Sequence, residues 1–283
     1  MKSLHGKTVV VTGAGSGMGR AYVLEAVRRG AKVAFNDIDA ADLVETARRC
    51  GTATILARAV DVSDEAQVDA FAREVEEQLG SADVVINNAG IEGEGQPFWA
   101  TSQESFDRVM GVDFWAVVYG ARAFLPQLLE RERGYLVNVS SLFGLVGPPH
   151  HTDYSAAKFA VRGFSESLAA ELLGTSVMVY TVHPGGVATR ITRRQATQAF
   201  HQKYLRTEPA AIARCVFDRL GSPRTRIVCG NRAQTTWLGA RLLPQRLMNR
   251  LTSRDLGPIL DRSAYPVQDW LMKRRAESRR GRS

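Results

Sequence analysis

The sequence lacks any apolar run long enough to cross a bilayer, and it lacks an amino-terminal apolar core followed by a small-residue cleavage site. We therefore expect neither a transmembrane helix nor a secretory signal. Cysteine is scarce: Cys50, Cys215 and Cys229 lie far apart, and none belongs to a CxxC pair. This argues against a disulfide framework or a zinc site and favours a reducing compartment. We expect a cytoplasmic protein.

A surplus of one charge is also absent from most of the chain. The first 222 residues have a net charge of −2, whereas residues 223–283 carry 14 Lys or Arg against 4 Asp or Glu. The overall charge of +8 is thus no evidence that the main body binds nucleic acid. Apolar residues make up 45% of the chain, which argues against a disordered protein or a fibre. The length suits one generous domain with an appendage.

Short β-branched runs alternate with longer amphipathic segments along the chain. Most of these runs are continuously apolar, as expected for parallel strands that are covered on both faces. The order predicts right-handed crossovers and an α/β fold with one doubly wound parallel sheet, helices on both faces and a carboxy-terminal helical extension. The seven expected strands are residues 8–12, 32–36, 55–60, 84–87, 135–139, 177–183 and 226–229. The expected helices are residues 17–29, 40–50, 65–79, 103–130, 154–172 and 209–219, and Pro126 is expected to kink or locally open the fourth.

A glycine-rich segment, Thr12–Gly19 (TGAGSGMG), follows the first expected strand and opens the first expected helix. Its glycines at 13, 17 and 19 allow a tight turn, close approach of the backbone to a pyrophosphate, and close packing of helix on strand. The helix N-terminus presents unpaired N–H groups to negative charge. In this position the segment predicts a Rossmann-type, dinucleotide-binding sheet rather than an ordinary turn.

Asp37 lies at the end of the second expected strand, about twenty residues beyond the glycines. An acidic side chain there accepts hydrogen bonds from the adenosine ribose and repels a 2′-phosphate. Neither Ser16 nor Ile38, the neighbours that could hold such a phosphate, is basic. NAD is therefore favoured over NADP. The alternative, with Asp39 close by, is a solvated loop aspartate.

Tyr154 and Lys158 are four residues apart on an expected helix and hence share one face. A phenol with a pKa of about 10 is a poor base at neutral pH, but a nearby ammonium group lowers that pKa. The pair can then remove an alcohol proton while hydride leaves for a nicotinamide. Alone, the pair would be read as a surface pair. The glycine loop and Ser141, thirteen residues upstream, favour the catalytic interpretation.

These motifs occur in an order that resembles the short-chain dehydrogenase/reductase family, in its TGxxxGxG and YxxxK subgroup, and in particular bacterial members with a basic carboxy-terminal extension. The resemblance covers roughly residues 5–190 and is extended to about 230 by the last strand. The matching positions are Thr12–Gly19, Asp61-Val62, Asn87-Asn88-Ala89-Gly90, Ser140-Ser141, Tyr154-x-x-x-Lys158 and Pro184-Gly185.

The resemblance implies Tyr154 as acid/base, Lys158 as its activator and Ser141 as the partner of the substrate oxygen, while Ser140 is taken as a turn residue. It also implies that Thr189 bonds the nicotinamide carboxamide; His183 is expected to be structural. From the glycine loop and the resemblance together, the expected cofactor contacts are Gly13, Ser16, Gly17, Met18, Gly19, Asp37, Asp61, Val62, Asn87, Ala89, Gly90, Tyr154, Lys158, Pro184, Gly185, Val187 and Thr189.

One residue departs from the family pattern. The family has an Asn in a VN(F/L)xG segment of the long helix, where this chain has Asp113 in VDFWA. The resemblance gives that Asn the task of holding a water that links the lysine to solvent. Asp113 is nearly isosteric, but if ionised near Lys158 it raises the pKa of the lysine and competes with the phenolate for its field. We expect Asp113 to be a relay member that reduces activity or shifts it in pH.

Three segments are expected to close over the nicotinamide: residues 91–99, 142–152 and 188–205. The first two are rich in apolar side chains, with His150 and His151 as polar exceptions. Such a pocket suits a hydrophobic or cyclic secondary alcohol and its ketone, unless the same side chains only pack a lid. No metal is expected, because the adjacent histidines diverge and no carboxylate or Cys sits at ligand spacing.

Residues 235–254 interleave Trp237 and several leucines with arginines and are interrupted by Pro244. This predicts a basic amphipathic segment that lies on an anionic membrane, meets a neighbouring subunit or caps the pocket. A helix packed on its own domain with arginines outward is an equal alternative. We divide the chain into an NAD-binding catalytic domain, residues 1–232, and a basic extension, residues 233–283, whose final run at 273–282 is expected to be a mobile tail.

The sequence thus predicts an NAD-dependent short-chain alcohol dehydrogenase or carbonyl reductase that acts on a small-molecule alcohol or carbonyl. The resemblance also implies a homodimer or homotetramer built on the two long helices. The alternative is a catalytically weak NAD(H)-binding sensor or scaffold that engages a partner or membrane through its basic carboxy-terminus. Asp113 favours that alternative, and the intact set of Ser141, Tyr154 and Lys158 opposes it. Nucleic-acid binding is not expected, because stacking platforms and a reading motif are missing.

Overall fold

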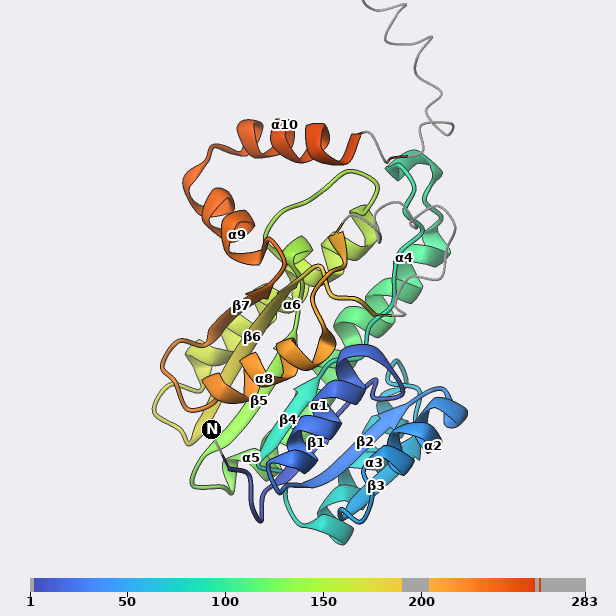
Figure 1. Ribbon diagram of the computed structural model, residues 1–283, viewed down its shortest axis with the longest axis vertical. Helices are drawn as coiled ribbons and strands as arrows, with labels where there is room; N and C mark the ends of the chain where they lie inside the picture. Colours follow the sequence, from blue (N-terminus) through green and yellow to red (C-terminus); the bar gives the residue numbers. More distant parts are fainter. Residues whose placement is uncertain (1–2, 190–203, 258–259, 261–283) are drawn as a thin grey trace, which may run out of the picture.

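A computed structural model describes residues 3–189, 204–257 and 260 of the chain. Its strands form one seven-stranded parallel sheet in the order β3-β2-β1-β4-β5-β6-β7 (Figure 1). The predicted doubly wound sheet is confirmed, and every predicted strand lies within two residues of an observed one. The strands are β1 (Thr8–Val11), β2 (Lys32–Asp37), β3 (Ile55–Ala59), β4 (Val84–Asn87), β5 (Gly134–Val139), β6 (Val177–Gly185) and β7 (Arg226–Gly230).

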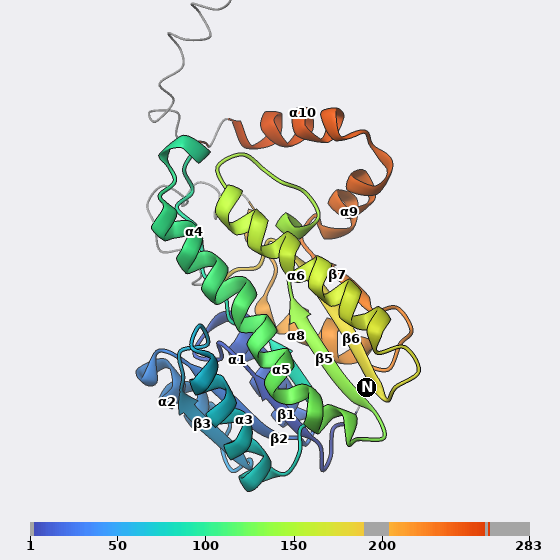
Figure 2. The same cartoon turned by 180° about the vertical axis from the view of Figure 1, so that it is seen from behind.

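Helices cover both faces of the sheet. Figure 1 shows α1 and α8 on the near face, and Figure 2 shows α3, α5 and α6 on the other. The main-body helices are α1 (Gly17–Arg28), α2 (Ala40–Arg49), α3 (Glu65–Leu79), α4 (Gln103–Met110), α5 (Ala116–Leu129), α6 (Thr152–Glu171) and α8 (Pro209–Arg219). Short turns of other helix types occur at η1 (Phe98–Ala100), η2 (Gly111–Trp115) and η3 (Leu142–Gly144).

The central strand β1 explains why the strand sequences are continuously apolar. Val9 and Val11 pack into the core beneath α1 and α8, whereas Val10 packs into the opposite core beneath α3 and α5. All three are fully buried, and each buried valine contributes about 1.5–3 kcal/mol relative to an exposed one. A strand with two buried faces has no position left for a polar side chain.

The strand order reverses at β1, which pairs with β2 on one side and with β4 on the other. In sheets of this kind, ligands bind beyond the carboxyl ends of the strands at this point of reversal. The loops that follow β1, β4, β5 and β6 all leave from that edge, because the strands are parallel. They carry the glycine segment and the other predicted site residues.

The prediction for the long helix at residues 103–130 is wrong in one respect. The segment is divided into α4, a π-helical turn η2 and α5. Pro126 does not open the helix, because α5 continues through it to Leu129. Pro126 lies in the last turn, where it removes a single backbone hydrogen bond. The departure from α-helical geometry occurs instead around Asp113, the residue that departs from the family pattern.

The carboxy-terminal extension is helical, as predicted. Helices α9 (Ala233–Leu242) and α10 (Gln245–Leu256) are separated at Pro244 and lie at the end of the molecule beyond the carboxyl edge of the sheet (Figure 1). The expected tail at 273–282 and most of the segment 188–205 lie outside the described residues. In the described part of the chain, no helix has both the length and the apolar character that a bilayer crossing requires.

Candidate active site

The glycine segment forms a tight turn that only glycine allows. Gly13 and Gly17 have φ angles of 65° and 53°, in the left-handed region that side chains disfavour. A Cβ atom on Gly19 would lie 1.9 Å from the Gly13 carbonyl oxygen. The turn delivers the chain to the start of α1, where the Ser16 side chain makes no capping bond and the first turn holds no acidic residue. The positive end of α1 is therefore left for a ligand anion.

The loop after β4 braces this turn. The Asn88 side chain donates to the carbonyl oxygens of Thr12 at 2.9 Å and Gly13 at 3.1 Å. The Thr12 hydroxyl in turn accepts from the backbone N–H groups of Asn88 and Ala89. The backbone of Ala89 packs so closely on Gly13 that a Cβ there would lie 2.6 Å from the Ala89 Cα. Asn88 is a positioning residue that the sequence analysis did not single out.

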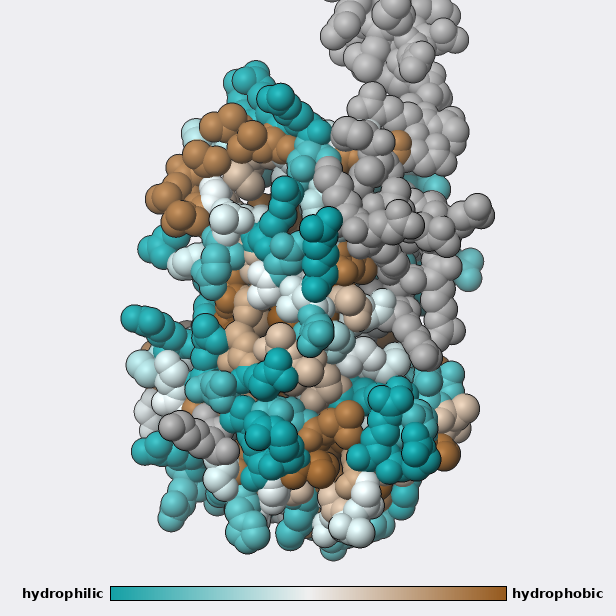
Figure 3. Space-filling model, in the orientation of Figure 1, coloured by the Kyte–Doolittle hydropathy of each residue, from teal (hydrophilic) through white to brown (hydrophobic). Residues whose placement is uncertain are grey.

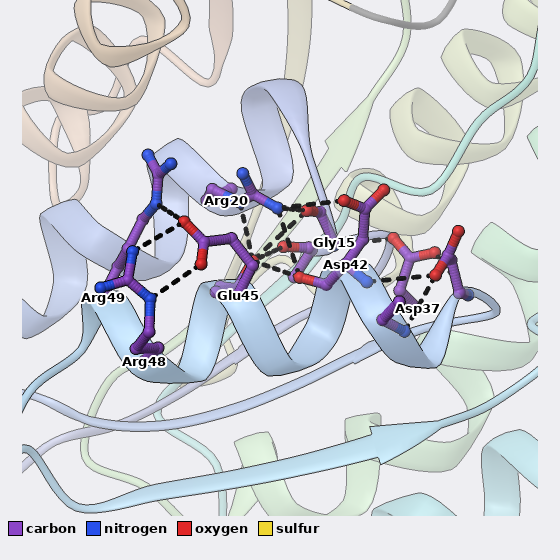
Figure 4. Close-up of polar contacts among 11 residues, drawn as sticks. Gly15, Arg20, Asp37, Asp42, Glu45, Arg48 and Arg49 are labelled. Atoms are coloured by element: carbon purple, nitrogen blue, oxygen red, sulfur yellow. Dashed lines mark hydrogen bonds and ion pairs between the residues drawn. The ribbon is translucent and has the colours of Figure 1, made fainter.

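Acidic side chains gather at the end of the glycine turn (Figure 4). Asp37 accepts from the backbone N–H of Gly15 at 2.7 Å and from that of Asp39 at 3.1 Å. Arg20 lies at the same end but is held by the carbonyl oxygen of Gly15, by the Thr46 hydroxyl and by Asp42, at 3.4 Å from its carboxylate. The Arg20 guanidinium is therefore already engaged in hydrogen bonds and an ion pair within the protein. Asp37 and Asp42 thus place two carboxylates at this end of the cleft.

A cleft of about 680 Å³ runs along the carboxyl edge of the sheet. Most of the predicted cofactor residues line it: Gly13, Ser16, Gly17, Met18, Gly19, Asp37, Asp61, Val62, Ala89, Gly90 and Thr189. Asn87 does not, because its buried side chain donates to Asn138 at 2.9 Å inside the molecule. Gly185 is also absent from the described lining; a Cβ there would lie 2.1 Å from the Asn231 carbonyl oxygen. Its role is to let β6 and the turn after β7 approach each other.

A second, apolar pocket of about 220 Å³ opens beside the cleft. Ser141, Tyr154, Pro184 and Val187 line it, and Met18, Glu92 and Thr189 line both spaces, so cleft and pocket meet there. The Tyr154 ring packs edge-on against Phe143, with centroids 6.1 Å apart. The Lys158 Nζ lies 5.6 Å from the centroid of the Tyr154 ring. The predicted catalytic residues Ser141 and Lys158 thus both lie close to Tyr154.

Asp113 and Lys158 form a buried ion pair beneath Gly90. Asp113 Oδ2 lies 3.0 Å from Lys158 Nζ, and the two side chains are 0% and 3% exposed. The other carboxylate oxygen accepts from the backbone N–H of Ile91 at 2.7 Å. A Cβ on Gly90 would lie 3.3 Å from both Asp113 Oδ2 and Lys158 Nζ. A side chain at position 90, which lines the cleft, would therefore press against the pair.

Burial and charge act in opposite directions on this group. Burial raises the pKa of Asp113 and outweighs the attraction of Lys158, which lowers it. Burial lowers the pKa of Lys158, but the attraction of Asp113 and Tyr154 outweighs it, so the net change is upward. We regard the pair as ionic because of its short distance. Burial also raises the pKa of Tyr154; Lys158 opposes this, and Asp113 adds to it.

Two further residues hold Ser141 and Lys158 in place. The ring Nδ1 of buried His183 lies 2.9 Å from the Ser141 carbonyl oxygen, and burial lowers the pKa of His183 to about 4. The imidazole is neutral at pH 7, so Nδ1–H donates to that carbonyl. The Ser140 hydroxyl donates to the Lys158 carbonyl oxygen at 2.8 Å. Ser140 therefore joins the catalytic helix to β5 and is more than a turn residue.

The sequence analysis offered a cap on the pocket as one role of the carboxy-terminal segment but did not identify the residues that line the pocket wall. Asn231, Arg232 and Thr236 line the pocket from the start of α9, and Thr252, Asp255 and Leu256 line it from the end of α10. Arg232 and Asp255 form an ion pair at 2.7 Å that ties the two helices together over the pocket. The alternation of Leu and Arg in α10 indicated an amphipathic helix, but not which face lay on the pocket. Of the alternatives weighed for this segment, capping of the pocket is what the contacts show.

Residues 7–199 match the short chain dehydrogenase family, and the chain belongs to that family. It is 37% identical to SadH, an oxidoreductase by name, of Mycobacterium tuberculosis over 86% of this chain and 93% of the relative. It is 36% identical to the 1-deoxy-11-beta-hydroxypentalenate dehydrogenase of Streptomyces avermitilis over 82% of this chain and 87% of that enzyme. The relatives are oxidoreductases, among them dehydrogenases of hydroxylated substrates.

Solved structures of the same family bind nicotinamide dinucleotides. A Burkholderia phymatum short-chain dehydrogenase/reductase in complex with NAD matches with a TM-score of 0.78 and 29% identity, over 91% of this chain and 97% of that one. A metagenomic short-chain oxidoreductase in complex with NADP matches with a TM-score of 0.69 and 28% identity, over 81% and 98%. The protein is thus an oxidoreductase of the short-chain dehydrogenase family with that family's nucleotide-binding sheet.

Proposed function

We propose that the protein is an NAD-dependent oxidoreductase that interconverts a hydrophobic or cyclic secondary alcohol and its ketone. The observation that carries this proposal is the junction of two spaces. Ser141 and Tyr154 line an apolar pocket that shares Met18, Glu92 and Thr189 with the glycine-lined cleft. A substrate in the pocket and a dinucleotide in the cleft would then meet beside an acid/base group.

NAD is the cofactor that the cleft supports best. The uncapped start of α1 and the left-handed turn at Gly13 and Gly17 suit a pyrophosphate. The acidic end of the cleft, with Asp37 and Asp61, suits ribose hydroxyls and adenine and repels a 2′-phosphate. Thr189 is the residue we assign to the carboxamide. When bound, the cofactor supplies the nicotinamide that accepts or returns hydride.

Tyr154 is assigned the proton transfer. In alcohol oxidation its phenolate removes the substrate's hydroxyl proton, and in ketone reduction its hydroxyl returns it. The Lys158 ammonium lowers the pKa of Tyr154, and so does a hydrogen bond with Ser141. The Ser141 hydroxyl would bond the substrate oxygen as charge develops on it. His183 holds the Ser141 backbone in place.

The pocket wall favours an apolar substrate. Leu142, Phe143, Val146 and Pro148 form one side of it, and Leu256 of α10 contributes from the cap. Apolar contact area of this kind binds hydrocarbon rings and chains, while few polar groups fix the orientation. Small polar diols would leave this surface unfilled. The hydroxypentalenate dehydrogenase relative has a name that is consistent with such a substrate.

The test is the formation of NADH or NADPH from a panel of cyclic and long-chain secondary alcohols. We expect turnover with NAD, and we expect Tyr154→Phe to reduce kcat by about 10²–10⁴-fold while NADH binding, followed by fluorescence, is retained. Tyr135→Phe, at a buried tyrosine of β5, is the matched control and should keep its activity. Preference for NADP, or undiminished activity of Tyr154→Phe, would overturn the proposal.

A second candidate, an NAD(H)-binding sensor with weak catalysis, is favoured by the ion pair of Asp113 and Lys158. The carboxylate offsets the positive charge on which the Tyr154 phenolate depends. The same assay separates the two functions. Tight NADH binding with no turnover across the panel, in wild type and Tyr154→Phe alike, would favour the sensor.

A further inference from the structure

Two of the three cysteines, far apart in sequence, lie together where α8 packs on β7. Cys229 of β7 is buried in the core formed with α1 and α8, and Cys215 of α8 packs against the same core while remaining partly accessible. The two thiols are near enough that each changes the pKa of the other. The sequence spacing gave no sign of this, because the two cysteines are 14 positions apart and belong to different elements.

The two sulfurs have different surroundings. Arg219, one turn further along α8, donates through Nη1 to the Cys215 sulfur at 2.8 Å. The neighbouring Cys229 thiol and the charge of Arg219 lower the pKa of Cys215 to about 7. The neighbouring Cys215 in turn raises the pKa of Cys229. A thiolate beside a guanidinium is the reactive form of cysteine, and a neighbouring thiol is the partner that resolves its oxidation.

We propose that Cys215 and Cys229 are a peroxide-oxidisable dithiol that closes reversibly to an intramolecular disulfide. The Cys215 thiolate attacks one oxygen of a hydroperoxide; the O–O bond breaks, and the sulfenic acid forms with release of hydroxide or alkoxide. The Cys229 thiol then attacks that sulfur, the S–O bond breaks, and water leaves as the S–S bond forms. A dithiol reductant reverses the step by thiol–disulfide exchange.

The position connects this site to the substrate pocket. Cys229 is followed by Gly230 and Asn231, and Asn231 lines the pocket. The Asn231 backbone N–H donates to the Thr207 hydroxyl at 2.7 Å, and its side chain donates to the Tyr204 carbonyl oxygen at 2.9 Å. A covalent bond at Cys229 is therefore made two residues from the pocket wall, outside the proton-transfer machinery.

Cys50 provides the matched control within the same chain. It is buried, its thiol donates to the Thr46 carbonyl oxygen at 3.3 Å, and burial raises its pKa. It has neither a cation nor a second cysteine as a described contact. Cys50 should remain a thiol under conditions that oxidise the pair.

The experiment treats the reduced full-length protein with hydrogen peroxide at pH 7, blocks remaining thiols with N-ethylmaleimide, and maps the unreduced peptides by mass spectrometry. We expect a Cys215–Cys229 cross-link and a single blocked thiol at Cys50, and the same cross-link should form in Cys50→Ser. Cys215→Ser should form no disulfide, and Arg219→Ala, at an exposed position, should slow its formation. Three blocked thiols after treatment, a cross-link between chains, or an oxidation rate in Arg219→Ala equal to that of wild type would overturn the proposal.

Discussion

Asp113 changes the electrostatics of the proton-transfer group because it places a carboxylate where an amide would be neutral. It lies 3.0 Å from Lys158 and is completely buried, so solvent does not screen its charge. The lysine must serve two anions, the Asp113 carboxylate and the Tyr154 phenolate. After burial, Asp113 is one of the groups that raise the pKa of Tyr154. In the proposed mechanism Asp113 therefore acts through its neighbours and is a positioning residue.

Replacing Asp113 by Asn should move the pH profile of alcohol oxidation to lower pH. The reactive form is the phenolate, so the rate rises with pH until Tyr154 is ionised. Loss of the Asp113 charge lowers the pKa of Tyr154 and so moves the rising part of the pH profile to lower pH. At a pH on that rising part, turnover should increase roughly tenfold for each pH unit by which the profile moves. The same change leaves Lys158 without a buried counter-ion and should reduce the free energy of unfolding by about 2 kcal/mol. The measurements are kcat against pH and urea denaturation.

Asp83→Asn is the matched control for that experiment. Asp83 is also a buried carboxylate, but it accepts from Lys7 at 3.0 Å and from the Thr8 backbone at 2.9 Å, at the edge of the sheet opposite the cleft. It should lose stability without any movement of the pH profile. If the rising part of the pH profile is unchanged in Asp113→Asn, the Asp113 carboxylate does not act on Tyr154.

Part of the site could be predicted from spacing alone. Tyr154 and Lys158 are four residues apart on a helix and so share a face, and Ser141 lies two residues beyond a buried strand. Asn87 shows where spacing fails. It lies at a strand end beside the cleft, but its side chain turns inward to Asn138 of the neighbouring strand. Which face of a strand end a side chain takes depends on the partner strand, and that partner cannot be read from local sequence.

At the scale of elements, the π-helical turn η2 is the feature that the sequence did not reveal. Hydrophobic periodicity marks a helix over residues 103–130 but does not register one extra residue in a turn. The expected disturbance at Pro126 was placed by residue type alone. Instead, the turn occurs at Asp113, whose side chain is fully buried while Trp115 is 45% exposed. The local helix geometry thus directs the carboxylate toward Lys158.

The cap helices α9 and α10 also present an outer face to solvent. Leu242, Leu243, Leu247 and Leu251 are exposed there, and Leu247 and Leu251 lie one turn apart on α10. Arginines at 246, 250 and 254 form a parallel row along α10, and Figure 3 shows apolar and polar residues side by side on this end of the molecule. Apolar side chains bordered by arginines match the interface of an anionic bilayer.

We expect the full-length protein to sediment with vesicles that contain phosphatidylglycerol and to do so less with phosphatidylcholine alone. Substitution of Arg246, Arg250 and Arg254 by Gln should weaken partitioning roughly a hundredfold, since each arginine contributes about 1 kcal/mol near an anionic surface. Val44→Glu, at an exposed apolar position of α2, is the control and should change nothing. Vesicle binding that depends on neither the lipid charge nor the three arginines would exclude the proposed contact of α10 with an anionic membrane.

At the scale of the whole molecule, the fold was the most predictable property. Continuous apolar strands alternating with amphipathic helices leave one arrangement that buries both faces of each strand, and the observed sheet has it. The pocket was less predictable. Its wall combines η3, the start of α6 and the end of α10, which are brought together only by the tertiary fold. The extension is therefore part of the candidate active site, although its sequence resembles an appendage.

Self-association is the remaining prediction for the molecule as a whole. Trp115, Leu129 and Phe159 are 45%, 45% and 41% exposed on the two long helical segments that the family resemblance assigns to the subunit interface. Large apolar side chains at such exposure indicate a surface that another subunit covers. Light scattering should give a dimer or tetramer of the 31.0 kDa chain. Phe159→Glu should shift the species toward the monomer, because a buried carboxylate without a partner is costly.

Leu173→Glu, at a position 81% exposed just beyond α6, should leave the assembly intact. A wild-type mass of one chain, or a monomer produced equally by both substitutions, would contradict an interface on these helices.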